Sequence, residues 1–134
     1  MKHYKRCYKV FNDCVFDDDR VCAGLGYATT KELLRLGATR VVMACRDIQR
    51  GFAARRRLAF ELASEAPDGG VKPFEVEQRV FVRVLDLASL ASVRAFADAF
   101  LREFDRLDVL ILNAGCAGEH TNFTVSCLVV LYEC

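Results

Sequence analysis

The stretch from Leu107 to Gly115, LDVLILNAG, contains the residues whose types point most directly to a chemistry. A continuous apolar run that ends in Asn113, Ala114 and Gly115 is typical of a buried parallel strand beside a nucleotide site. The alternative is a core strand that is followed by an ordinary Asn-Gly type of turn. We take the stretch as evidence for a dinucleotide-binding fold.

The seven cysteines are the other residues that could do chemistry, as metal ligands or in disulfides. They are scattered along the chain and form no Cys-x-x-Cys pair: Cys7, Cys14, Cys22, Cys45, Cys116, Cys127 and Cys134. An odd, scattered set favours reduced intracellular thiols over a zinc site or a disulfide framework. We therefore expect no metal site.

The composition indicates one globular domain, because 53% of the 134 residues are hydrophobic and 28% are charged. The net charge of +1 gives no overall field that would attract nucleic acid or an anionic membrane. No segment reaches the roughly 18 apolar residues of a membrane span, and the first residues lack the apolar core of a signal peptide. We expect a cytoplasmic protein that binds no nucleic acid and has no membrane span.

The elements that must position the Asn-Ala-Gly turn alternate between helix and strand, which favours an α/β fold. A helix is expected over residues 26–36, ended by Gly37, and Thr39 to Ala44 is expected to form a buried strand. A second helix is expected from Asp47 to Ala66. Its apolar residues near one face are Ile48, Phe52, Ala59, Leu62, Ala63 and Ala66.

The second half of the pattern completes a strand-helix-strand-helix-strand unit with parallel strands. Pro67 to Arg79 contains Pro-Asp-Gly-Gly and a second proline, which predicts a surface insertion or loop, and Val80 to Leu85 is expected to be a strand. Leu107 to Leu112 is the next expected strand. The helix between these strands has a core-facing apolar stripe: Val93, Phe96, Ala97, Phe100, Leu101 and Phe104.

Residues 24–115, which hold these elements, resemble the cofactor-binding half of the short-chain dehydrogenase/reductase family. The resemblance rests on four short motifs in the family's order: Gly-Leu-Gly at 24–26, Ala-Cys-Arg-Asp at 44–47, LDLASLASVRAF at 85–96 and Leu-Asn-Ala-Gly at 112–115. The stretch GLGYATTKELLRLGATRVVMACRD is similar to the retinol-dehydrogenase-like, NADP-preferring members. The resemblance implies a partial Rossmann-like parallel sheet with crossover helices, truncated before the catalytic half.

By this resemblance, Gly24, Leu25 and Gly26 would form the turn into the first helix. Absent side chains there would let backbone N–H groups and the helix N-terminus approach a pyrophosphate. Counting back from Gly24 places Arg20 where the family has its first glycine, and Asp19 where it has a threonine.

The acidic run Asp17 to Asp19 would oppose the charge of a pyrophosphate in that position. The alternative for this run is a solvated acidic loop without a function. In the family's usual strand order, 3-2-1-4, the first strand is central. Only Tyr8 to Phe11 or Cys14 to Phe16 could supply it here.

The resemblance also implies that the cofactor is NADP. Cys45 stands where NAD-dependent relatives have an acidic residue for the ribose hydroxyl, and Arg46 could attract a 2′-phosphate instead. The alternative is that Arg46 is an ordinary exposed arginine before a helix that Asp47 caps.

Two further groups of residues match cofactor positions of the family. Asp86 and Leu87 are placed like the pair that contacts the adenine, although Asp86 could simply end a strand. Asn113, Ala114 and Gly115 match the motif that supports the sheet and lies under the cofactor.

The resemblance implies no catalytic residue in this sequence. The family uses a serine, a tyrosine and a lysine four residues after that tyrosine, all beyond the Asn-Ala-Gly motif. After Gly115 the sequence has Ser126 and Tyr132 but no lysine. Tyr27 and Lys31 have the required spacing, but they follow the Gly-Leu-Gly turn, and we assign them no catalytic role.

The segments 1–23 and 116–134 diverge from the family. The apolar stretch Val125 to Tyr132 could add a strand beside Leu107 to Leu112 or could stay unpaired. We expect an inactive NADP(H)-binding fragment of a family that transfers hydride between NADP(H) and an alcohol or carbonyl. The alternatives are a non-catalytic binding or regulatory module, which self-associates or pairs with a full-length relative, and an unstable product of truncation or mis-joining.

Overall fold

The computed structural model describes residues 7–11, 24–65 and 71–113. These residues build a sheet of four parallel strands in the order β3-β2-β1-β4. The strands are β1 (Cys7–Phe11), β2 (Arg40–Cys45), β3 (Val80–Val84) and β4 (Val109–Leu112). The predicted α/β fold with a parallel sheet in the order 3-2-1-4 is confirmed.

The central strand β1 comes from the first of the two candidate segments. Val10 lies opposite Met43 of β2 on one side and opposite Ile111 of β4 on the other. The second candidate, Cys14 to Phe16, lies outside the described residues, as do Asp17 to Asp19 and Arg20.

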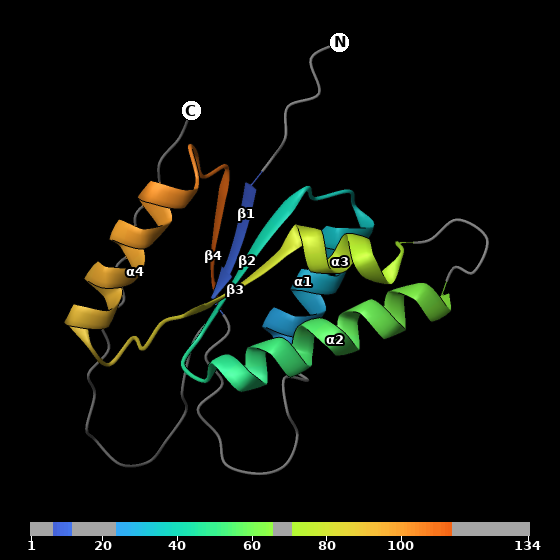
Figure 1. Cartoon of the computed structure of the whole chain (residues 1–134), viewed down its shortest axis with the longest axis horizontal. Coiled ribbons are helices and arrows are strands. Elements are labelled where there is room, and N and C mark those ends of the chain that lie inside the picture. Colours follow the sequence, from blue (N-terminus) through green and yellow to red (C-terminus); the bar gives the residue numbers. More distant parts are fainter. Residues whose placement is uncertain (1–6, 12–23, 66–70, 114–134) are drawn as a thin grey trace.

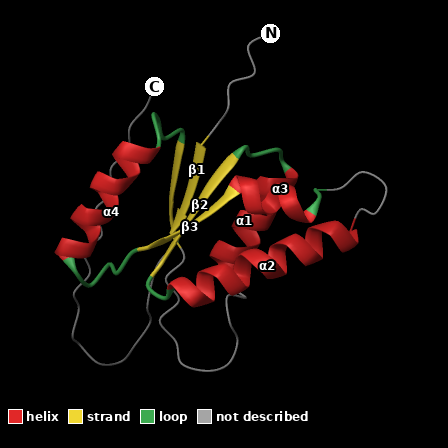
Figure 2. Cartoon of the chain, in the orientation of Figure 1, coloured by secondary structure: helices red, strands yellow, loops and turns green. Residues whose placement is uncertain are grey.

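Four helices cover the two faces of the sheet. They are α1 (Leu25–Arg35), α2 (Ile48–Glu65), α3 (Pro73–Arg79) and α4 (Leu90–Glu103). Figure 1 shows α1, α2 and α3 together on one side of the strands, whereas α4 lies by itself on the other side. The same arrangement is visible in Figure 2, where helices and strands are coloured by type.

Strand β2 is buried on both faces, which explains why its sequence is a continuous apolar run. Val41 and Met43 belong to the core under α1, α2 and α3, while Val42 and Ala44 belong to the core under α4. Alternate residues of a strand point to opposite faces, so the two cores meet along β2.

Helix α4 covers its face of the sheet with an aromatic stripe. Phe96, Phe100 and Phe104 are buried, and the ring centroids of Phe100 and Phe104 are 4.8 Å apart. The prediction that Ala97 and Leu101 also face the core is wrong, because both are exposed and Leu101 is 75% exposed. The three phenylalanines are spaced by four residues, so the next position along the chain is rotated about 100° away from the sheet.

Helix α2 packs on the sheet through a face that the sequence predicted only in part, because Ala59 and Leu62 are buried as expected. Its buried residues are Gly51, Ala54, Leu58, Ala59 and Leu62, whereas Ile48, Phe52 and Ala63 are only half-buried, and Ala66 lies outside the described residues. Gly51 marks the closest approach to the sheet. A Cβ added there would clash with a side-chain carbon of Val82 and would lie 2.6 Å from Cys45 Sγ. Small residues define this face because the helix axis lies close to the strands.

The prediction that Pro67 to Arg79 is a loop is wrong for residues 73–79, which form α3. Pro73 stands in the first turn, where its missing N–H costs no hydrogen bond, and Val76 is fully buried. Arg79 donates from Nε to the Ala38 carbonyl at 2.7 Å and from Nη2 to the Leu34 carbonyl at 2.9 Å. Burial lowers the pKa of Arg79. These tertiary contacts stabilise a helix of only seven residues, which its own sequence could not do.

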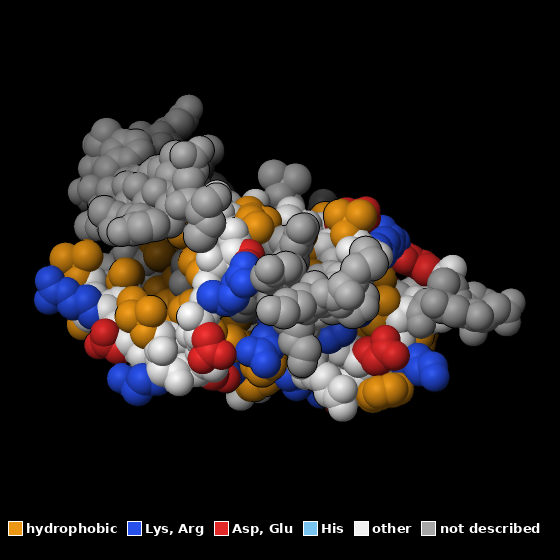
Figure 3. All heavy atoms as spheres, turned by 90° about the horizontal axis from the view of Figure 1, so that it is seen from above, with side chains coloured by type: hydrophobic (Ala, Val, Ile, Leu, Met, Phe, Trp, Pro, Cys, Tyr) orange, Lys and Arg blue, Asp and Glu red, His pale blue; other side chains and the backbone are white. Residues whose placement is uncertain are grey.

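Figure 3 views the molecule from the side on which the strands begin. Basic, acidic and hydrophobic side chains are mixed over the coloured surface, and several hydrophobic ones gather on the α4 side. The visible charges therefore form no large patch of one sign, as the net charge of +1 leads one to expect.

Candidate cofactor site

All four parallel strands end at the same edge of the sheet, which is the lower edge in Figure 1. Helices α1 and α2 begin at this edge. The chain runs from β1 to β2 and β3 on one side, whereas β4 lies on the other side of β1. Ligands of open α/β sheets bind where the strand order reverses in this way, at the carboxyl ends of the strands.

The predicted residue Gly24 stands at the start of α1. It is the N-cap, with φ −82° and ψ 179°, and its carbonyl accepts from the amides of Tyr27 at 3.1 Å and Ala28 at 3.2 Å. The amides of Leu25 and Gly26 precede these and have no carbonyl partner within the helix. Gly26 is buried, and its carbonyl accepts from the Thr30 hydroxyl at 2.9 Å. The start of α1 thus presents N–H groups and the positive end of the helix dipole.

The turn after β2 contains Arg46 and Asp47. Asp47 caps α2, because its Oδ1 accepts from the amides of Gln49 at 2.9 Å and Arg50 at 3.2 Å. Arg46 is exposed, and no hydrogen bond or ion pair joins it to the described part of the chain. The capping alternative is therefore confirmed for Asp47, and the Arg46 guanidinium is available to an anion.

Cys45, the last residue of β2, contacts this turn through its side chain. Its side chain is buried, and Sγ donates to the Asp47 carbonyl at 3.3 Å. A buried thiol at this place brings no negative charge to the turn, in contrast to an acidic side chain.

The turn after β3 contains Asp86 and Leu87. The Leu85 amide donates to the Cys45 carbonyl at 2.9 Å, which carries the pairing with β2 one residue beyond the strand. Asp86 Oδ1 then accepts from the Ala88 amide at 3.0 Å, while Leu87 packs against the core under α4. Asp86 therefore begins the turn and fixes its shape, with its side chain at the same edge as Arg46.

Asn113 directly follows β4 and is half-buried at this edge. Ala114 and Gly115 lie outside the described residues. The structure thus places Arg46, Asp86, Leu87 and Asn113 after the ends of three strands, and Gly24, Leu25 and Gly26 at the start of α1 on the same edge. Their binding roles stay predictions.

The Tyr-x-x-x-Lys sequence on α1 has another role for its lysine. Lys31 Nζ lies 2.6 Å from Glu61 Oε2 and 2.6 Å from Glu65 Oε1, both on α2. The hydrogen bonds to Glu61 and Glu65 raise the pKa of Lys31. The pKa of Glu61 is lowered to about 2, mainly by the hydrogen bond from Lys31 and next by the one from Arg57. Lys31 therefore ties α1 to α2, whereas a lysine that assists a tyrosine must face the substrate.

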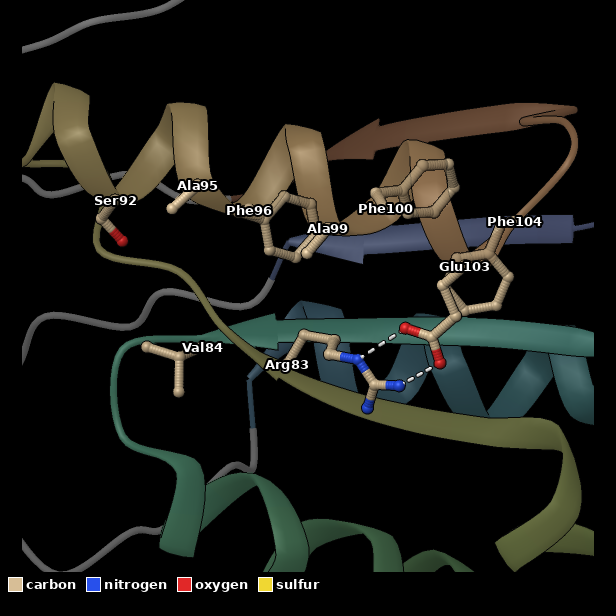
Figure 4. Close-up of a pocket in the computed structure, with 9 residues that line it drawn as sticks. All are labelled: Arg83, Val84, Ser92, Ala95, Phe96, Ala99, Phe100, Glu103 and Phe104. Atoms are coloured by element: carbon tan, nitrogen blue, oxygen red, sulfur yellow. Dashed lines mark hydrogen bonds and ion pairs between the residues drawn. The ribbon is translucent and has the colours of Figure 1, made fainter.

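Sequence reasoning missed Ser92 and the space between α4 and β3. Ser92 Oγ accepts from the Asp86 amide at 2.9 Å. The available signal was Ser89, because a serine directly before an apolar helical stretch is typical of an N-cap and predicts where the helix begins. A cavity of about 230 Å³ lies beside Ser92, and Figure 4 shows Arg83 of β3 and Glu103 of α4 joined by two hydrogen bonds across it.

The described residues are 7–11, 24–65 and 71–113. They contain no group of three His, Cys, Asp or Glu side chains that could hold a metal ion. No helix in these ranges is both long enough and apolar enough to cross a membrane.

Comparison with curated proteins gives close relatives for part of the chain. It is 53% identical over 93 residues to retinol dehydrogenase 14 of Mus musculus, which covers 69% of this chain and 27% of the relative. It is 50% identical over 96 residues to dehydrogenase/reductase SDR family member 13 of Homo sapiens, covering 72% and 22%. The chain thus spans about a quarter of the length of these relatives.

Solved structures share the fold. Menthone neomenthol reductase from Mentha piperita matches with a TM-score of 0.63 and 34% identity, over 84% of this chain and 32% of that chain. A metagenomic short-chain oxidoreductase in complex with NADP matches with a TM-score of 0.57 and 27% identity, over 84% and 40%. The family described as short chain dehydrogenase matches residues 21–127. With its Rossmann-like sheet, the chain belongs to the short-chain dehydrogenase family.

Proposed function

We propose that this chain forms the NADP(H)-binding unit of a short-chain oxidoreductase. The observation that carries the proposal is the convergence at one sheet edge of the α1 N-terminus, Arg46, Asp86 and Asn113. These groups provide N–H donors for a pyrophosphate, a cation for a ribose phosphate and a carboxylate for an exocyclic amine. These groups therefore suit the pyrophosphate, the ribose phosphate and the adenine of the dinucleotide.

The preference for NADP over NAD rests on the turn after β2. Arg46 is exposed and without a partner in the described part of the chain, so its guanidinium can pair with a 2′-phosphate. Cys45 is buried and supplies no carboxylate that would accept a ribose hydroxyl. The NADP of the structural relative is consistent with this assignment.

We propose that the chain binds this cofactor without turning over a substrate. When bound, the cofactor exchanges hydride with an alcohol or carbonyl carbon, a reaction that also requires a group to move a proton. The sequence has one Tyr-x-x-x-Lys spacing, at Tyr27 and Lys31, and Lys31 is held by Glu61 and Glu65. The residues at the sheet edge bind and orient the cofactor, and we assign to none of them the transfer of the proton that accompanies the hydride.

The test is thermal unfolding of the purified chain with NADP, with NAD and without nucleotide. A ligand at about 100 times its Kd that binds only the folded state adds about 2.7 kcal/mol to the free energy of unfolding. We expect a rise of the midpoint with NADP, a smaller rise with NAD, and loss of the difference in Arg46→Ala. Arg56→Ala, which removes an exposed arginine of α2 away from this edge, should keep it. A cooperative transition that neither nucleotide shifts contradicts the proposal, and NADPH-dependent turnover contradicts the absence of catalysis.

A second candidate is a module that pairs with another copy or with a full-length relative. Strand β4 is an outer strand of the described sheet, and Val109 and Leu112 are 37% and 45% exposed. Outer strands with apolar side chains are sites of strand addition. The same melting experiment tests this candidate, because the midpoint of a paired form rises with protein concentration. A midpoint that is independent of concentration contradicts it.

A further inference from the structure

The first turn of α4 holds the turn that follows β3. The Asp86 amide donates to Ser92 Oγ at 2.9 Å, and the Ser89 amide donates to the Asp86 carbonyl at 3.2 Å. Ser89 Oγ in turn accepts from the Ser92 amide at 3.3 Å. Both backbone polar groups of Asp86 are therefore fixed by residues of the α4 N-terminus.

The side chain of Asp86 is fixed on one side only. Oδ1 accepts from the Ala88 amide at 3.0 Å, whereas Oδ2 has no hydrogen-bond partner in the described ranges. A carboxylate offers about four lone-pair sites, so Asp86 keeps acceptor capacity after closing its own turn. The side chain is half-buried at the sheet edge, where an acceptor of this kind suits an exocyclic amine.

The two serines of α4 have separable tasks. Ser89 is the N-cap of α4, since its hydroxyl accepts from an amide of the same helix. The Ser92 hydroxyl reaches out of the helix to the chain that leaves β3, and Figure 4 shows it directed toward that segment. Leu85 donates the last amide hydrogen bond to β2. The next amide, that of Asp86, is held by Ser92 instead, so Ser92 fixes the position of the main chain after the strand.

We propose that Ser92 is a positioning residue for adenine recognition, acting through Asp86. This inference rests on the proposed NADP(H) function, in which Asp86 accepts from the amino group of the adenine. With Ser92 in place, the Asp86 amide is satisfied and the carboxylate has one orientation. Without the hydroxyl, a partly buried N–H loses its acceptor, the turn shifts, and the Asp86 carboxylate loses its fixed orientation.

The test compares 2′,5′-ADP with its hypoxanthine analogue, which lacks the amino group, by calorimetric titration. The unmodified chain should bind the adenine form about tenfold more tightly, which is the difference expected for one hydrogen bond to a charged acceptor. Ser92→Ala should reduce this preference to about twofold or less, and Ser92→Cys, a poor acceptor of similar size, should lie between them. Ser92→Thr retains the hydroxyl and should retain the preference.

Ser64→Ala is the matched control, because Ser64 is an exposed serine of α2 whose hydroxyl bonds only within its helix, to the Phe60 carbonyl at 2.8 Å. It makes the same chemical change and should leave the preference for adenine unaltered. A purely structural role of Ser92 would weaken both ligands equally, so the ratio of the two affinities separates positioning from folding.

Each outcome bears on the proposal. A full adenine preference in whichever of Ser92→Ala and Ser92→Cys melts cooperatively overturns the role of Ser92 but leaves the proposed function standing. Loss of the preference in folded Ser92→Thr also overturns it. If the unmodified chain binds neither ligand, the proposed function fails, and the role of Ser92 fails with it.

Discussion

The two faces of the sheet are packed very differently. Under α1, α2 and α3, Leu34, Leu58 and Val76 are at most 1% exposed, and Gly51 brings α2 almost into contact with the strands. Under α4, three phenylalanines and the Arg83–Glu103 ion pair span the space to β3, and a cavity of about 230 Å³ is left. The densely packed face fixes the starts of α1 and α2, whereas the face with the cavity carries the turn of Asp86.

The largest expected effect of a substitution is on the densely packed face. Leu58→Ala removes a side chain that is 0% exposed and should lower the free energy of unfolding by about 2–5 kcal/mol. Leu101→Ala, on the outer side of α4, should change it by less than about 0.5 kcal/mol. Chemical denaturation of both variants checks this, and a similar loss for the two would show that Leu101 is buried against an unrecognised surface.

A matched pair of substitutions from alanine to leucine sharpens the comparison between the faces. Ala54→Leu overfills the core between α2 and the sheet, where Ala54 is 1% exposed, and should cost about 1–3 kcal/mol or more. Ala99→Leu places the same added atoms in the cavity that Ala99 lines and should be neutral or stabilising by about 0.5–1 kcal/mol. The melting midpoint should fall for Ala54→Leu and should stay level or rise for Ala99→Leu. Equal destabilisation would mean that the cavity under α4 is not available to a side chain.

The smallest expected effect concerns the ion pairs between α1 and α2. Hydrogen bonds from Lys31 and then Arg57 lower the pKa of Glu61 from 4.5 to about 2 in the folded chain. A depressed folded pKa stabilises the fold above the unfolded value, so this contribution is complete above pH 4.5 and is lost as the pH falls toward 2. Denaturation curves between these pH values should show a shallower acid dependence for Glu61→Gln than for the unmodified chain.

Glu77→Gln is the control for that series, because Glu77 is exposed and has no ion pair with any described residue. Its acid dependence should match that of the unmodified chain. The same slope for Glu61→Gln would show that the Lys31 contact does not persist in solution.

The sequence predicted most of the fold, because its signals were local. The run from Val41 to Ala44 is apolar on both strand faces, and Gly37, with φ +88°, ends α1 where a glycine was expected to do so. The strand order was available from the family resemblance. What failed depended on partners distant in the chain: α3 is stabilised by Arg79 reaching α1, and the α2 face is set by how closely Gly51 approaches Val82.

The candidate site was predictable in location but not in detail. Arg46, Asp86 and Asn113 each follow a strand, so a parallel sheet necessarily places them at one edge. The role of Ser92 could not be predicted, since the bond from the Asp86 amide depends on the angle at which α4 leaves the sheet. Short motifs specify which residues meet a ligand, and the packing of the helices behind them specifies how those residues are held.

The central position of β1 has a consequence for the synthesis of the chain on the ribosome. Tyr8 lies opposite Val41 and Val109, so β1 is made before both of its partner strands and cannot complete its pairing until almost all of the described chain has emerged. Closing such a long loop is entropically costly and slows folding. During elongation, a nascent sheet of β1, β2 and β3 would expose the unpaired edge of β1, and unpaired strand edges make partly folded chains prone to aggregation.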